Sequence, residues 1–226
     1  MKHLWWLDLV FFVLLAVCAT SVKARSDLDF PLEKGNTWIY RGPVEWTKQN
    51  SNQVEKKILE WKMEVVEVFQ KPSLTIARIK GHPEDLIWYE KGTPRGEYLI
   101  IALENREYYI VSLIEPFKKE FINAFEVKDG ELIDKSKTSR QFLELPLQKG
   151  SKFAIEKDRK DNMYCWRCDG VREKKSNKKE FLLTFETGPD CISFGFTPGI
   201  GISSYKYVHD GTVANCNLEL IKFARK

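Results

Sequence analysis

The stretch FPLEKGNTWIY, residues 30–40, is written a second time in altered form as LPLQKGSKFAI, residues 145–155. The two copies share a Pro-Leu-x-Lys-Gly core, since Pro31, Leu32, Lys34 and Gly35 recur as Pro146, Leu147, Lys149 and Gly150. Proline fixes φ and cannot donate to a ladder of strand hydrogen bonds, whereas glycine permits a tight turn. We therefore interpret each copy as the entrance to a β-strand that opens one half of the chain.

These two entrances predict the domain organisation. We expect a signal peptide over residues 1–24, a first β unit over 25–114, a connector over 115–144 and a second β unit over 145–226, all within one compact domain. The predicted fold class is all-β and mostly antiparallel, either a β-sandwich or one strongly curved sheet made of two related halves, with at most one short helix. The alternative is that the repeat is a coincidence between two strand-entry turns.

Alternation of apolar and charged residues carries the strand prediction. In LEWKMEV, residues 59–65, the side chains of Leu59, Trp61, Met63 and Val65 share one face and the charged side chains share the other. The phase then changes, because Val66 directly follows Val65 and is also apolar. An extra residue at this point predicts a β-bulge.

Further strands follow at short spacings. We predict strands at 86–90, 98–103 and 108–114, joined as an antiparallel meander, with the last two covered on both faces because they are almost wholly apolar. After the second entrance we predict strands at 163–167, 181–186, 191–196, 202–208 and 213–223. Asp169–Gly170 and Asp210–Gly211 predict hairpin turns. The segment EPFKKEFINAF, residues 115–125, is the one candidate for a helix of any length.

The N-terminus predicts export. Lys2 is followed by an apolar stretch over residues 9–18 and by small side chains before Ala24, which is the pattern of a secretory signal cleaved after that residue. Two alternatives stay open, namely lipidation at Cys18 and an uncleaved anchor in which Asp8 is costly to bury. The expected location is periplasmic or secreted, with the chain tethered to the envelope in either alternative.

The charge of the mature chain is nearly balanced. Without residues 1–24 it carries 34 basic and 31 acidic residues. The basic runs at 157–161 and 172–180 are interleaved with acids, so we interpret them as solvated hairpin tips and expect no nucleic-acid partner.

Four cysteines remain after cleavage: Cys165, Cys168, Cys191 and Cys216. An even number in an oxidising compartment predicts disulfides. The pairing stays open between the local arrangement, Cys165–Cys168 with Cys191–Cys216, and the two crossed arrangements. A four-cysteine zinc site lacks close spacing in its second half, and a redox dithiol lacks a helix N-terminus, so neither a metal nor a cofactor is predicted.

No catalytic motif is present in the sequence, neither a nucleophile elbow, nor His-Glu-x-x-His, nor a phosphate loop. His82 and His209 adjoin turn residues, and we interpret both as surface histidines. Ser203 and Ser204 lie near His209 in sequence but on a strand without an elbow. Carboxylates that could serve glycoside hydrolysis are available, as on any soluble surface, at Glu84, Asp85, Glu90, Glu186 and Asp190. No catalytic residue is predicted.

Aromatic residues are the one surplus of the composition. Adjacent pairs such as Trp88–Tyr89 and Tyr108–Tyr109 point to opposite faces of a strand, so one member of each pair is a candidate for a groove. The candidate ligand-binding residues are Trp61, Trp88, Tyr108 and Trp166, on a surface that stacks sugars or lines lipid.

Three motifs together resemble a group of exported bacterial proteins, many of them lipoproteins. They are Pro-Leu-x-x-Gly-x-x-Trp-x-Tyr at residues 31–40, its weaker second copy, and TPGIGISSYKYVHDG at residues 197–211, which holds the Pro-Gly-x-Gly element of that group. The chain departs from the group at Phe153, where a tryptophan is usual, and in the cysteine pair of YCWRC. The resemblance implies export and β architecture, and it implies no active site, because the group has no assigned biochemical function.

The sequence names no reaction. We predict an exported, non-enzymatic β protein that binds an envelope partner or an apolar or envelope-derived ligand. The alternatives are an envelope hydrolase acting on glycans and a scaffold without a cleft. Contact with a membrane is expected only through an uncleaved or lipidated N-terminus.

Overall fold

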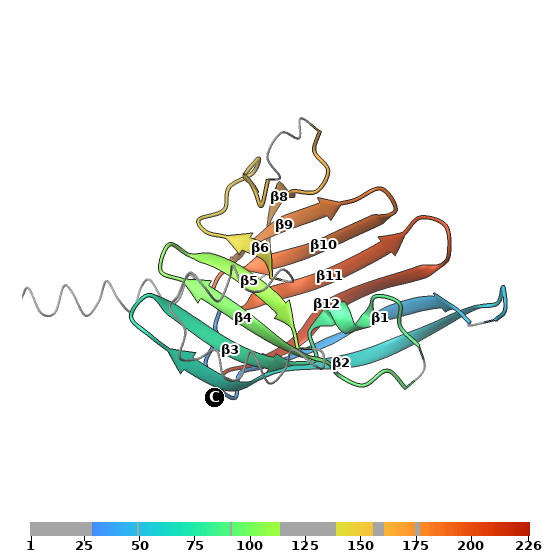
Figure 1. The fold of residues 1–226 in the computed structure, drawn as a ribbon, viewed down its shortest axis with the longest axis horizontal. Coiled ribbons are helices and arrows are strands. Elements are labelled where there is room, and N and C mark those ends of the chain that lie inside the picture. Colours follow the sequence, from blue (N-terminus) through green and yellow to red (C-terminus); the bar gives the residue numbers. More distant parts are fainter. Residues whose placement is uncertain (1–28, 49, 91, 114–138, 156–160, 175–176) are drawn as a thin grey trace, which may run out of the picture.

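Twelve antiparallel strands form one strongly curved sheet (Figure 1). The structure, a computed structural model, describes residues 29–48, 50–90, 92–113, 139–155, 161–174 and 177–226. The strands are β1 (Thr37–Thr47), β2 (Val54–Gln70), β3 (Leu74–Lys80), β4 (Glu97–Leu103), β5 (Glu107–Ser112), β6 (Arg140–Glu144), β7 (Lys152–Phe153), β8 (Trp166–Glu173), β9 (Lys179–Glu186), β10 (Asp190–Thr197), β11 (Gly201–His209) and β12 (Ala214–Ala224). Pro83–Leu86 form a 3-10 turn, η1. The predicted all-β, antiparallel curved sheet is confirmed.

The strand order reveals two meanders of six strands. The order is β6-β5-β4-β3-β2-β1-β12-β11-β10-β9-β8-β7, so β1 pairs with β12 in the middle and β6 and β7 form the two ends. The sheet wraps until these ends approach each other, where the indole Nε1 of Trp166 on β8 donates a 3.0 Å hydrogen bond to the carbonyl of Gln141 on β6. We call this junction the seam.

Both copies of the repeat form the same turn. Gly35 and Gly150 have φ of 93° and 89°, which only glycine adopts without strain. The N–H of Asn36 donates to the Glu33 carbonyl at 3.1 Å, and in the second copy the N–H of Ser151 donates to the Gln148 carbonyl at 3.0 Å. The first turn leads into the central strand β1, and the second leads into the two-residue edge strand β7. The repeat therefore marks the start of each meander.

Phe30 fills one end of the wrapped sheet. Its ring lies 5.9 to 6.3 Å from the rings of Trp38, Tyr108, Phe142 and Phe196, which come from β1, β5, β6 and β10. A Cβ on Gly201 would lie 3.1 Å from this ring, so the Pro-Gly-x-Gly segment provides the space for it. Next to it, the Trp38 indole donates to the Ile200 carbonyl at 2.6 Å and the Tyr40 hydroxyl donates to the Ile202 carbonyl at 3.0 Å. The N-terminal and C-terminal motifs are thus two halves of one packing contact.

The opposite end is capped by residues 81–96. η1 begins after His82, whose Nδ1 accepts from the N–H of Glu84. Asp85 fixes the return of the chain, because its carboxylate accepts from the Gly96 N–H at 2.9 Å and from the Tyr98 hydroxyl at 2.6 Å. The predicted strand at 86–90 is therefore wrong. Pro83 suits the first position of a helical turn, and the acidic residues that follow it favour that turn over a strand.

Register and burial decide several smaller predictions. The bulge is confirmed, because the β2–β3 register shifts between Val65 and Glu67. Burial on both faces of the meander is also confirmed, since a second apolar cluster covers the other face of β3–β5 and comprises Leu74, Ile76, Leu99, Ile101, Val111 and Leu113.

Two loop predictions have different outcomes. The turn at Asp210–Gly211 is confirmed, and Gly211 has φ of 110°. The hairpin at Asp169–Gly170 is wrong, because both residues lie inside β8, where the register to β9 shifts between Cys168 and Gly170. A bulge uses the same tolerant residue types as a turn. The candidate helix at 115–125 lies outside the described residues, and β6 lies within the segment predicted as a connector.

Phe30→Ala is expected to lower the free energy of unfolding by about 3 kcal/mol, because it removes a buried ring that contacts four strands. Urea denaturation measures this loss. Ile221→Ala is the control, since Ile221 is 54% exposed and its loss should cost less than about 0.5 kcal/mol. Equal effects of the two variants would contradict the role of Phe30.

Asp85→Asn is expected to change how stability depends on pH. Burial raises the pKa of Asp85 to about 6, although hydrogen bonds from Tyr98 and Gly96 act against it. The folded protein therefore holds this proton more tightly than the unfolded chain, and the resulting stabilisation is lost as the pH rises through about 6. The stability of the wild type relative to the variant should fall by about 1–2 kcal/mol between pH 4 and pH 7, a figure reduced for partial exposure. A constant difference in urea denaturation at these pH values would refute the prediction.

Candidate functional site

The structure separates the four aromatic residues that the sequence singled out. Trp61 and Trp166 are buried, and their indole N–H groups donate to the carbonyls of Gly81 and Gln141. Tyr108 is buried against Phe30. Trp88 is different, because 51% of it is exposed. The aromatic candidates therefore form no common surface, and Trp88 alone among them is available to a ligand.

Trp88 sits on the cap in an unusual backbone conformation. Its φ is +54°, which is rare for a bulky residue and costs on the order of 1–3 kcal/mol unless the surroundings hold it in place. The ring lies edge-on against His209, with ring centroids 4.5 Å apart. Strain of this kind clusters at functional sites, and Trp88 combines it with high exposure and a ring contact to His209.

Polar residues of β10 and β11 form a hydrogen-bonded group next to Trp88. Asp190 and His209 are direct neighbours in the β10–β11 register, and His209 Nδ1 lies 2.8 Å from an Asp190 carboxylate oxygen. The Tyr207 hydroxyl donates to the same oxygen at 2.6 Å. The bond from Tyr207, reinforced by the bond from His209, lowers the pKa of Asp190 against the opposing effect of burial. Asp190 is therefore a carboxylate at neutral pH.

A hollow of about 270 Å³ adjoins this group. Its wall combines polar and apolar residues, namely Asp190, Glu186, Thr187 and Asp210 with Met163, Gly188, Pro189, Cys191 and Val208. The hollow is connected to the Trp88 indole through Asp190, which bonds His209. Its mixture of carboxylates and apolar side chains is suited to a ligand with an apolar ring face and hydroxyl edges. We call Trp88, Tyr207, His209, Asp190 and this hollow the Trp88 site.

Sequence reasoning missed His209 and Asp190 as a pair. His209 was predicted to be a surface histidine with no special task, and Asp190 was one of many carboxylates. The turn at residues 198–200 could have indicated this pair. It joins β10 and β11 as a hairpin, and pairing of these two strands places Asp190 opposite His209. Neither residue could be singled out without that register.

The arrangement contains no serine triad among the described residues. Ser203 does contact an acid, but its hydroxyl donates to Glu180 at 2.5 Å, and Ser203 lies six residues from His209 along β11. At about 3.3 Å per residue this separation is far beyond hydrogen-bond reach. The acid–serine pair and the acid–histidine pair are therefore separate.

The Glu180 group is a closed ion-pair network. Glu180 is fully buried, and it accepts from Ser203, from Arg172 and from Lys174, the last at 2.9 Å. Burial alone would raise the pKa of Glu180, but hydrogen bonds from Arg172, Ser203 and Lys174 outweigh burial and lower it. A Cβ at Gly195 would lie 2.4 Å from this carboxylate, so glycine is required there. The buried Glu180 carboxylate is thus paired within the protein and is not exposed to a ligand.

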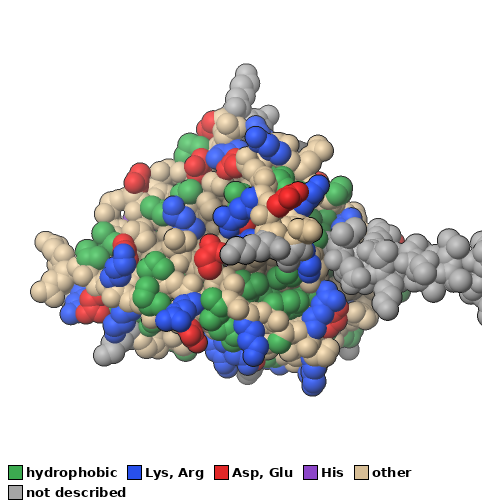
Figure 2. All heavy atoms as spheres, turned by 180° about the vertical axis from the view of Figure 1, so that it is seen from behind, with side chains coloured by type: hydrophobic (Ala, Val, Ile, Leu, Met, Phe, Trp, Pro, Cys, Tyr) green, Lys and Arg blue, Asp and Glu red, His purple; other side chains and the backbone are tan. Residues whose placement is uncertain are grey.

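Charges elsewhere on the surface are also arranged in pairs of opposite sign. Across neighbouring strands Lys56 pairs with Glu45 and Arg78 pairs with Glu67. Figure 2 shows that hydrophobic, basic and acidic side chains are intermixed on the back of the molecule, with basic side chains gathered along its lower edge.

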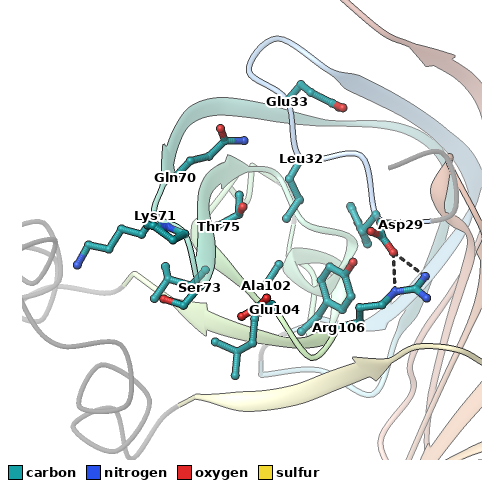
Figure 3. Close-up of a pocket in the computed structure, with 15 residues that line it drawn as sticks. Asp29, Leu32, Glu33, Gln70, Lys71, Ser73, Thr75, Ala102, Glu104 and Arg106 are labelled. Atoms are coloured by element: carbon teal, nitrogen blue, oxygen red, sulfur yellow. Dashed lines mark hydrogen bonds and ion pairs between the residues drawn. The ribbon is translucent and has the colours of Figure 1, made fainter. Parts of the chain in front are cut away.

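A second hollow of about 290 Å³ lies at the Phe30 end (Figure 3). The segment 29–33 and the β2–β3 and β4–β5 turns enclose it. Asp29 and Arg106 form an ion pair at its rim, with a closest distance of 2.6 Å, and Tyr108 lies in the wall. Asp29 and Arg106 neutralise each other, and no exposed aromatic face comparable to Trp88 is among the lining residues.

The four cysteines are free, which overturns the predicted disulfides. Cys191 and Cys216 lie on β10 and β12 with β11 between them, so their Cα atoms are about 10 Å apart, beyond disulfide reach. Strand β9 separates Cys191 from Cys165 and Cys168 in the same way. The last two thiols donate to the backbone carbonyls of Asn162 and Gly170. The disulfide prediction was based on the number of cysteines and the expected compartment, and neither of these indicates which strands lie between the cysteines.

Two further features of the described residues bear on chemistry. No group of three or more His, Cys, Asp or Glu side chains suited to a metal ion occurs in the part of the chain that the structure describes. No helix within those residues has the length and apolar character needed to span a membrane.

No protein-family model matches the chain, and no curated protein matches it. Two solved structures align with it. One is a "putative lipoprotein" from Parabacteroides distasonis, 10% identical, with a TM-score of 0.39 and coverage of 86% of this chain and 97% of that chain. The other is a "putative exported protein with YmcC-like fold" from Bacteroides fragilis, 8% identical, with a TM-score of 0.41 and coverage of 88% and 100%. Similarity at this level carries no information on site residues or a ligand.

Alkylation is expected to label each of Cys165, Cys168, Cys191 and Cys216 after unfolding without a reductant, as identified by peptide mass spectrometry. In the folded state labelling should be slow, because burial raises the pKa of Cys216 to about 12 and also raises that of Cys168. A thermal midpoint that falls on adding a reductant, or fewer than four labelled residues, would show that disulfides form.

Proposed function

We propose that this chain is an exported, non-enzymatic β protein that binds a glycan of the cell envelope at the Trp88 site. The observation that carries the proposal is the exposed, strained Trp88, whose ring contacts His209, together with the hollow that Asp190, the partner of His209, helps to line. Export itself is proposed from the signal pattern of residues 1–24. A periplasmic or secreted location is proposed because it follows from export.

The chemistry of the Trp88 site supports a sugar over a purely apolar ligand. A pyranose ring presents C–H groups that pack on an indole face, and its hydroxyls donate to carboxylates such as Asp190 and Asp210. An apolar ligand would remove water from these carboxylates without offering them a hydrogen bond, which is costly. The interior cavity formed by the described residues Trp166, Phe142 and their neighbours is too small for such a ligand, because its volume is only about 10 Å³.

The same groups favour binding over hydrolysis. A glycosidase needs one carboxylic acid that keeps its proton and one carboxylate. At the Trp88 site the pKa of Asp190 is lowered, and Glu186 forms an ion pair with Arg167 at 3.0 Å. The carboxyl with a pKa of about 6 is Asp85, which is held by Tyr98 and Gly96 under the cap. Asp190 is therefore unsuited to the role of the general acid of a glycosidase.

Trp88→Ala is expected to weaken binding of a neutral oligosaccharide at least tenfold, because the stacking face is lost. Chitohexaose and maltohexaose are suitable probes, and titration calorimetry measures the Kd. Trp88→Phe should retain most of the affinity, because an aromatic face remains.

Phe69→Ala is the matched control, since Phe69 is an aromatic residue that is 37% exposed on β2. This variant should bind like the wild type. If the wild type binds neither oligosaccharide but binds decanoate, an apolar ligand replaces the glycan in the proposal. Release of reducing ends from either oligosaccharide would establish the hydrolase alternative.

A further inference from the structure

A small cavity lies inside the wrapped sheet, next to the seam. Its walls are apolar side chains, among them Ile110, Phe142 and Ile202, and the buried Trp166 that bridges the seam. The space open to the centre of a water-sized sphere is about 10 Å³, which is the room that one water molecule needs. Three polar side chains also line it, namely His82, Arg140 and Tyr205.

Each of these three side chains has a buried polar atom that lacks a hydrogen-bond partner within the described residues. The atoms are His82 Nε2, Arg140 Nε and the Tyr205 hydroxyl oxygen. They come from the N-cap of η1, from β6 and from β11. An unsatisfied buried polar group is costly, and native proteins leave few of them. Three around one cavity therefore indicate a shared partner.

The remaining hydrogen bonds fix what that partner must offer. His82 Nδ1 accepts from the Glu84 N–H at 3.2 Å, so the neutral ring carries its proton on Nε2. Arg140 is held through Nη2, which lies 2.8 Å from the Glu84 carboxylate, and this leaves its Nε–H aimed elsewhere. The Tyr205 hydroxyl can accept as well as donate. The cavity thus presents two N–H donors and one hydroxyl acceptor.

We infer that this cavity is a binding site for one water molecule, which accepts hydrogen bonds from His82 and Arg140 and donates one to Tyr205. A water satisfies all three atoms at once. An anion fits less well, because Glu84 already neutralises Arg140 and His82 is neutral, since burial lowers its pKa to about 4. The site ties the cap to both walls of the sheet, because β6 and β11 lie on opposite sides of the interior.

A crystal structure of the exported protein at about 1.5 Å resolution, grown with and without bromide, tests the inference. The expected result is one density peak within hydrogen-bond distance of all three atoms, with no anomalous signal from bromide. An anomalous bromide peak would overturn the inference in favour of an anion site. A cavity without density would overturn it altogether.

Tyr205→Phe provides a second test in solution, because it removes one partner of the water and little volume. Hydrogen exchange of the Asp85 and Ile87 amides, which bond within the cap, should accelerate about tenfold while amides of β9 and β10 keep their rates. Tyr40→Phe is the control, since the Tyr40 hydroxyl is equally buried but donates to Ile202. Equal cap exchange in the two variants would overturn the inference. If Tyr205→Phe fails to fold, the wild-type crystal still decides.

Discussion

The contact between Phe30 and Gly201 is the constraint on which the wrapped sheet depends. A sheet of twelve strands buries an interior only if its distant strands meet, and the Phe30 ring touches residues of β1, β5, β6 and β10 at once. Its place exists because Gly201 has no side chain and adopts φ of 90°. The indole of Trp38 and the hydroxyl of Tyr40 then hold the adjacent backbone. The two motifs at opposite ends of the sequence are thus explained by one packing requirement.

Much of this architecture could be predicted because strands leave a local signal. Alternation marks β2, the paired valines mark its bulge, and the positive φ of Gly35 and Gly150 follows from a turn that both copies of the repeat encode. Prediction failed where a short segment supports two conformations. Residues 86–90 are apolar enough for a strand, yet Pro83 and the ties of Asp85 turn that segment into a cap. Asp169–Gly170 tolerates the backbone of a bulge as well as that of a hairpin.

The candidate site was less predictable than the fold because it depends on which strands become neighbours. Four aromatic residues looked equivalent in the sequence, and their burial separated them into three packing residues and the exposed Trp88. His209 gained its partner through the β10–β11 register, and the cysteines lost theirs because a strand intervenes between each distant pair. Residue type and spacing along the chain contain none of this information. The network around Glu180 shows the same limit, since a charged residue there is fully buried and fully paired.

The seam gives the molecule a mechanical asymmetry. Each of the eleven neighbouring strand pairs is joined by backbone hydrogen bonds. At the junction of the two ends of the sheet, the described residues make contact through side chains such as Trp166, which bonds to the Gln141 carbonyl. We therefore expect the two ends of the sheet to separate more easily than the long paired strands, because this breaks side-chain contacts and no long backbone ladder. Trp166 lines both the seam and the small interior cavity, so we expect water to reach that cavity through the seam without unfolding of either meander.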